Sequence, residues 1–114
     1  MKLSHVTALV TAADHGGFRP AARALGISQV ALAKQIRELE ESVGHQLFLR
    51  TSRGVAPTVY GGKLLPRARA VLSELSRLDQ EASMLSTFSL SVGLSPIVTL
   101  LLFHSKIYME LQKL

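Results

Sequence analysis

Apolar residues at helical spacing mark two helices at the start of the chain. One set predicts a helix from residue 2 or 3 to about residue 15, and it comprises Leu3, Val6, Leu9, Val10 and Ala13. Gly16-Gly17 ends this helix. Phe18 then starts the next element, Pro20 is tolerated in a first helical turn, and residues 21–25 predict a short second helix that ends at Gly26.

A third helix follows after only a few residues. Ser28 is a favourable N-cap, and an apolar set predicts a helix over residues 29–42, which Gly44 ends. This set is Leu32, Ile36, Leu39 and Val43. Because the gap after the second helix is short and contains glycine, the pair is typical of a helix-turn-helix.

A small β-hairpin is predicted next. Residues 47–49 are apolar, the RTSRG stretch at 50–54 reads as a turn, and residues 55–58 are short and extended. Pro57 is compatible with a strand edge. Two brief strands around RTSRG would form the wing of a winged helix-turn-helix.

A long helix is predicted from Thr58, or a residue close after it, through Ser86. Pro66 predicts a kink or a first-turn position. Apolar residues spaced alternately four and three apart form a heptad seam, and they are Leu64, Ala68, Val71, Leu75, Leu78, Ala82 and Leu85. A lone helix cannot bury such a seam, so a dimer interface is predicted, with packing onto the domain's own core as the alternative.

The pattern changes after Ser86. Leu90, Val92 and Leu94 alternate with small polar residues and predict a half-buried strand, and Pro96 opens an apolar helix over residues 97–111. The predicted fold is mainly α: a winged helix-turn-helix of three helices plus a small β-hairpin wing, a long linker helix and an incomplete α/β segment. The predicted divisions are a winged helix-turn-helix domain over residues 1–60, a linker and dimerisation helix over residues 61–87, and the start of an incomplete α/β domain over residues 88–114.

Charge favours a polyanionic partner. The 114 residues include 13 basic and 8 acidic side chains, for a net charge of +5, which suits nucleic acid or an anionic surface. The absence of cysteine fits a reducing cytoplasm. Residues 82–103 carry no Asp, Glu, Lys or Arg, but their many Ser and Thr residues and Pro96 argue against a membrane span.

The third helix carries the candidate chemistry on the side opposite Leu32. Glutamine near a helix N-terminus can pair with adenine in the major groove, and lysine or arginine can bind guanine or phosphate. A wing arginine can enter a flanking minor groove. The predicted DNA-binding residues are Arg19, Ser28, Gln29, Val30, Ala33, Lys34, Arg37, Arg50, Arg53 and Gly54.

Other chemistry finds no support in the sequence. The four histidines lack metal-ligand spacing and no cysteine accompanies them. Tyr60 is expected to pack rather than to reach DNA. No catalytic constellation is present, so an enzyme, a metal and a cofactor are not expected.

The stretch GISQVALAKQIRELEESVGHQLFLRTSRGVAPTVYGG resembles the winged helix-turn-helix of LysR-type transcriptional regulators. The resemblance covers residues 1 to about 86, and SLSVGLSP resembles the start of the family's effector-binding domain. Val30, Ala33, Pro57 and Gly17 depart from the family's usual residues. The resemblance implies a cytoplasmic regulator that binds double-stranded DNA as a homodimer, with higher oligomers in full-length relatives and a small-molecule inducer site that is absent or incomplete here.

Two rival interpretations differ in class. A truncated interaction protein could heterodimerise with full-length relatives through the linker helix without needing to bind DNA itself. A membrane-tethered regulator using residues 82–103 is a weaker alternative.

Overall fold

A computed structural model describes residues 1–91, 106, 107 and 110, with side chains for residues 1–85 and for the last three of these positions. The chain divides into two units, residues 1–75 and 76–114. No helix in the described part of the chain is long and apolar enough to span a bilayer.

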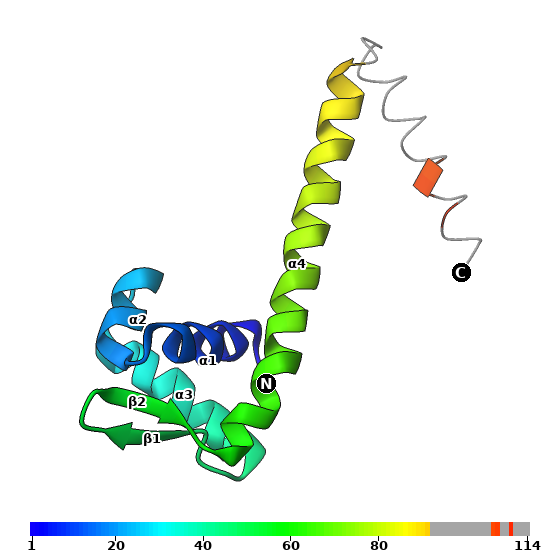
Figure 1. Cartoon of the computed structure of the whole chain (residues 1–114). Helices are drawn as coiled ribbons and strands as arrows, with labels where there is room; N and C mark the ends of the chain where they lie inside the picture. The colour runs from blue at the N-terminus through cyan, green and yellow to red at the C-terminus, as the bar shows by residue number, and fades with distance from the viewer. Residues whose placement is uncertain (92–105, 108–109, 111–114) are drawn as a thin grey trace. The chain divides into compact units, whose positions relative to one another are not determined.

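Three helices form the centre of the first unit (Figure 1), and they are α1 (Leu3–His15), α2 (Phe18–Leu25) and α3 (Gln29–Val43). Each ends at a glycine in the left-handed conformation, as predicted for Gly16, Gly26 and Gly44. The structure starts α2 at Phe18 rather than at residue 21, which places Pro20 in the first turn as expected. The helix-turn-helix is therefore confirmed.

The core lies where the helical pattern placed it. Leu32, Ile36 and Leu39 of α3 are at most 2% exposed to solvent. They belong to the same buried core as Leu9 of α1. The contact of an apolar stripe on each helix with its neighbours is the main source of stability for such short helices. Burial of this stripe leaves the opposite side of α3 as the exposed one.

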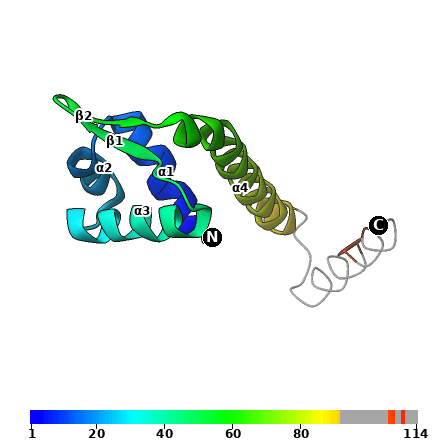
Figure 2. The same ribbon diagram turned by 90° about the horizontal axis from the view of Figure 1, so that it is seen from below.

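The predicted wing is an antiparallel hairpin of β1 (Phe48–Thr51) and β2 (Gly54–Pro57). Phe48 pairs with Pro57 and Thr51 pairs with Gly54, so the RTSRG turn closes at its tip. Pro57 stands at the end of its strand, where a missing N–H is tolerated. Figure 2 shows the hairpin beside the three helices, with its loop projecting beyond them.

A compact hydrogen-bond network joins α3, the wing and the long helix α4 (Val59–Ser91). Glu40 Oε2 accepts from the Leu47 N–H at 2.7 Å, and the Leu47 carbonyl accepts from the Thr58 N–H at 2.9 Å. Thr58 Oγ1 also accepts from the Gly61 N–H at 3.2 Å, so Thr58 precedes α4 as predicted. The backbones approach so closely that a Cβ on Gly61 would lie 2.2 Å from the Leu47 carbonyl oxygen.

The structure corrects the predicted end of the long helix. The helix continues to Ser91 rather than ending at Ser86, so Leu90 is helical and not part of a strand. The rest of the predicted strand, residues 92–94, lies outside the described residues. The predicted helix over residues 97–111 also lies outside them, apart from Lys106, Ile107 and Glu110, which are helical.

The first part of the heptad seam packs within the domain. Ala68 is only 8% exposed and belongs to the core, and Leu64 is half-buried against that core. These two residues therefore pack onto the domain's own core, which was the alternative to a dimer interface. Pro66 lies inside α4, beyond its first turn, so the first-turn position is wrong.

Candidate nucleic-acid interface

The outward side of α3 begins at a capped N-terminus. Ser28 Oγ accepts a hydrogen bond from the Ala31 N–H at 3.0 Å, as an N-cap should. Gln29, Val30 and Lys34 follow on the exposed side, and Val30 is 77% exposed. This side of α3 is therefore open to solvent in the described part of the chain.

The other two predicted α3 contacts differ in exposure. Arg37 is exposed, whereas Ala33 is half-buried. Both residues line a hollow of about 320 Å³ beside Leu49 and Arg50 of the wing. This part of α3 therefore faces the wing. A small residue at position 33 allows the helix backbone to approach a neighbouring surface closely.

A histidine buried beneath α3 influences the charge on that helix. His5 Nδ1 accepts from the Lys2 N–H at 3.1 Å, so Nε2 carries the proton that is donated to Glu38 Oε2 at 2.9 Å. This hydrogen bond holds the pKa of Glu38 below its ordinary value, and Lys34, whose Nζ lies 4.0 Å from Glu38 Oε1, adds to the effect. Glu38 therefore bridges the buried imidazole of His5 and the exposed Lys34 on the outer side of α3.

The His5–Glu38 contact could not be predicted from sequence, because a lone histidine and a glutamate 33 positions apart form no recognisable pattern. A second pair of this kind joins α1 to α4, where Asp14 Oδ1 lies 2.6 Å from Arg69. The guanidinium of Arg69 lowers the pKa of the Asp14 carboxyl group. Arg69 is therefore engaged within the domain.

The wing contributes two exposed arginines. Arg50 and Arg53 make no ion pair within the described part of the chain. The Arg53 N–H donates to Thr51 Oγ1 at 3.2 Å, which orders the turn at the hairpin tip. Both guanidinium groups are thus available to an anionic partner.

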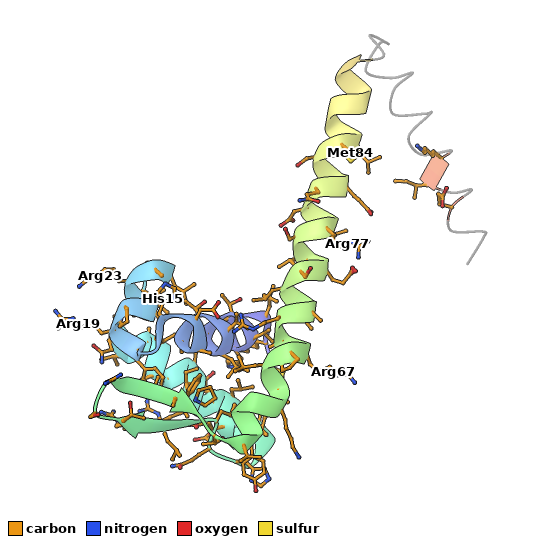
Figure 3. The ribbon with its side chains drawn as sticks, in the orientation of Figure 1. His15, Arg19, Arg23, Arg67, Arg77 and Met84 are labelled. Atoms are coloured by element: carbon orange, nitrogen blue, oxygen red, sulfur yellow. The ribbon has the colours of Figure 1, made fainter. Side chains whose placement is uncertain are left out.

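Arg19 of α2 is exposed as well. Figure 3 shows Arg19 and Arg23 projecting outward from α2, away from the helical core. Within the described residues neither side chain has an ion-pair partner. Their charges add to those of the wing on the surface around α2.

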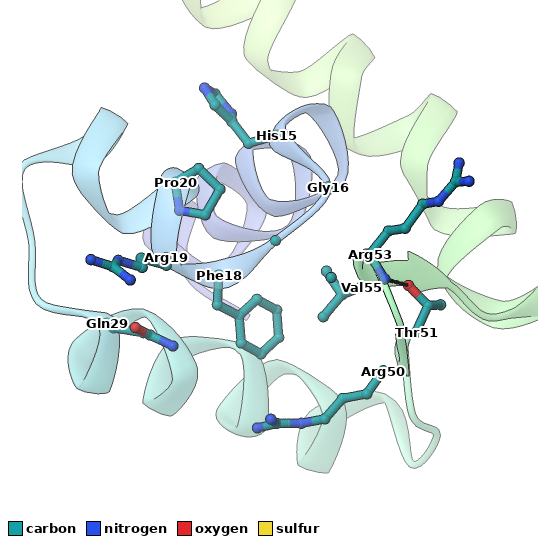
Figure 4. A pocket seen from close by; sticks show the side chains of 12 residues that line it. His15, Gly16, Phe18, Arg19, Pro20, Gln29, Arg50, Thr51, Arg53 and Val55 are labelled. Carbon is teal, nitrogen blue, oxygen red and sulfur yellow. Dashed lines mark hydrogen bonds between the residues drawn. The ribbon is translucent and has the colours of Figure 1, made fainter.

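A hollow of about 380 Å³ brings five of the predicted DNA-binding residues together. In Figure 4, Phe18 and Val55 lie at its centre, with Arg19 and Gln29 on one side. Its other side is formed by the wing, and the complete set of predicted contacts that line it is Arg19, Gln29, Arg50, Arg53 and Gly54. The start of α3 and the wing therefore border one concave, positively charged surface.

Gly54 packs differently from the residues beside it. Its backbone lies against the Gly16 carbonyl oxygen, although Gly54 also lines the hollow. Tyr60 stacks on His45 with ring centroids 3.8 Å apart, in agreement with the expectation that Tyr60 packs. Among the described residues there is no group of His, Cys, Asp or Glu side chains suited to a metal ion.

Comparison with known proteins agrees with this geometry. The family described as "Bacterial regulatory helix-turn-helix protein, lysR family" matches residues 3–62. The "Small neutral protease regulatory protein" of Streptomyces coelicolor is 45% identical over 80 residues, which cover 70% of this chain and 25% of that protein. The "DNA-binding transcriptional dual regulator OxyR" of Escherichia coli strain K12 is 42% identical over 101 residues, covering 86% of this chain and 33% of OxyR.

A solved structure extends the comparison to three dimensions. The BenM DNA-binding domain in a complex with catB site 1 DNA superposes with a TM-score of 0.71 at 32% identity, covering 75% of this chain and 97% of that one. The present chain spans between a quarter and a third of the length of the two curated relatives. The match over residues 3–62 and the shared fold show that this chain belongs to the LysR family of bacterial helix-turn-helix regulatory proteins.

Proposed function

We propose that this chain binds double-stranded DNA with sequence specificity and regulates transcription in the bacterial cytoplasm. The observation that carries the proposal is the shared border of one concave surface by Gln29 of α3 and by Arg50 and Arg53 of the wing. A helix and a hairpin that face the same way suit adjacent grooves of one duplex. The relatives named as transcriptional regulators and the DNA complex of the BenM domain support this proposal.

Apart from Gly54, each predicted contact then has a chemical role. Gln29 would pair with adenine in the major groove, while Lys34 and Arg37 would bind guanine or phosphate. Val30 and Ala33 would contact a thymine methyl group. Arg50 and Arg53 would enter or border a flanking minor groove, where A·T-rich sequence deepens the negative potential. Arg19 and the start of α3 at Ser28 would hold phosphates.

Selection of binding sites from random duplexes, followed by a salt series on the selected site, tests the proposal. A steep loss of affinity with salt is expected, because each phosphate contact releases counterions. The selected sites are expected to be two-fold symmetric. Failure to enrich any sequence, with affinity that depends on salt alone, would contradict specific regulation.

Gln29→Ala is expected to change the preference at one base pair by about 1–3 kcal/mol, because a bidentate contact to adenine is lost. Competition binding with duplexes that differ only at that base pair measures the change. Gln80→Ala is the matched control, since Gln80 is an exposed glutamine on α4. An equal loss of affinity on all sequences would show that Gln29 does not read a base.

We further propose that two copies pair through the seam on α4. Val71 is 48% exposed and Leu78 is 62% exposed. Such large apolar side chains on one helix face favour association with a second helix. Pairing by two-fold symmetry would present two copies of α3 to two half-sites.

A further inference from the structure

A backbone contact joins the wing to the helical unit, close to the tip of the hairpin. The Val55 N–H donates to the Gly16 carbonyl oxygen at 3.0 Å. Gly54, directly before it, has a φ of +132°. This conformation is one that side-chain-bearing residues rarely adopt.

The contact leaves no room for a side chain. A Cβ built on Gly54 would lie 2.1 Å from the Gly16 carbonyl oxygen and 3.7 Å from the Gly17 Cα. The neighbouring atoms belong to the backbone, so they cannot move aside by changing rotamer. The steric requirement and the φ requirement therefore both restrict position 54 to glycine.

The turn between α1 and α2 holds both strands of the wing. Gly16 ends α1 with a φ of +67° and supplies the carbonyl that holds β2. Two residues later, Phe18 packs edge-on against Phe48 of β1, with ring centroids 5.8 Å apart and an interplanar angle of 89°. Because Phe18 also lines the hollow beside Gln29, this turn is the structural link between the wing and the start of α3.

We propose that the Gly54–Gly16 contact is a positioning element that sets where the wing arginines meet DNA relative to Gln29. In this role Gly54 would act through the position of the wing rather than through a contact of its own with a base or phosphate. Arg53 directly precedes Gly54, so a shift of this contact displaces the Arg53 backbone while α3 stays in its core packing. The inference rests on the proposed DNA-binding function and assigns Gly54 a role different from the contact expected from sequence.

Gly54→Ala in the full chain tests the inference. The ratio of affinities for duplexes with A·T-rich and G·C-rich flanks is expected to fall about tenfold, in the range of one lost base-pair preference. The preference at the base pair read by Gln29 is expected to stay within about twofold of the parent value, since α3 is not altered. Gly62→Ala is the matched control, because a Cβ at Gly62 meets nothing within 4 Å.

A backbone ester at residue 55 provides a second variant in case Gly54→Ala does not fold. The ester removes the Val55 N–H, which donates a hydrogen bond to the Gly16 carbonyl oxygen, and it adds no bulk. The same selective loss of flank preference is expected. An unchanged flank preference in the ester variant, or an equal loss of both preferences in a folded variant, would overturn the positioning role while leaving DNA binding intact. Absence of duplex binding by the parent chain and by Gly62→Ala would overturn the proposed function and this inference with it.

Discussion

Leu78→Asp is expected to dissociate the dimer and to weaken binding to a two-half-site duplex by about 100-fold or more. A carboxylate placed without a partner in an apolar seam costs about 3–5 kcal/mol. Leu78 is 62% exposed in the single chain, so folding of the chain itself is expected to be unaffected. Sedimentation equilibrium measures the dimer, and titration with duplexes of one and two half-sites measures the binding.

Ser73→Asp is the matched control for charge. Ser73 is exposed and lies on the side of α4 opposite Val71 and Leu75, five positions before Leu78 in the sequence. This variant is expected to remain dimeric. If Leu78→Asp and Ser73→Asp behaved alike, the seam would not be the dimer contact.

A comparison of Leu78→Asp with Arg53→Ala addresses the alternative of a pure interaction protein. A chain that acted only by pairing with full-length relatives would lose activity with Leu78→Asp and keep it with Arg53→Ala. A DNA-binding regulator requires both residues. Arg53 is exposed and has no ion-pair partner among the residues that the structure describes, which supports the second case.

Leu32→Ala is expected to lower the free energy of unfolding by about 2–5 kcal/mol. Leu32 is 0% exposed and lies at the centre of the core that joins α3 to α1 and α2. The cavity left by the lost carbons cannot collapse fully in a close-packed core. Urea unfolding followed by circular dichroism measures the change.

Val30→Ala is the control, because Val30 lies two residues away on the same helix and is 77% exposed. Its effect on unfolding is expected to be within about 0.5 kcal/mol, as for other surface positions. The two variants together test which side of α3 is buried. A loss of stability with Val30→Ala as large as that with Leu32→Ala would contradict the described packing.

Local signals in the sequence were sufficient for the wing and for the three helices of the helix-turn-helix, apart from the first residues of α2. Glycines at positions 16, 26 and 44 mark helix ends because their backbone can adopt positive φ without a steric penalty. The apolar spacing identified Leu32 as buried, because α-helical periodicity places such residues on one side. These features depend on residues that are close in the sequence.

Some features could not be predicted from sequence because they join residues far apart in the chain. Others could not because the same residue pattern is compatible with two different structures. The contact of Gly54 with Gly16 and the hydrogen bond of His5 to Glu38 join distant segments without a spacing rule. The heptad pattern of Ala68 fits a core position as well as a dimer seam. Alternation around Leu90 resembles a strand, yet the structure continues the helix there, since a helix once formed extends more readily than it stops.

Photo-cross-linking from position 30 tests most directly whether the outward side of α3 enters DNA. A photoreactive residue in place of Val30 is compared with one in place of Ser73, in a complex with the selected duplex. We expect cross-links to bases, at major-groove positions, from residue 30 and none from residue 73. Stable binding of that duplex without base cross-links from residue 30 would contradict the entry of α3 into DNA.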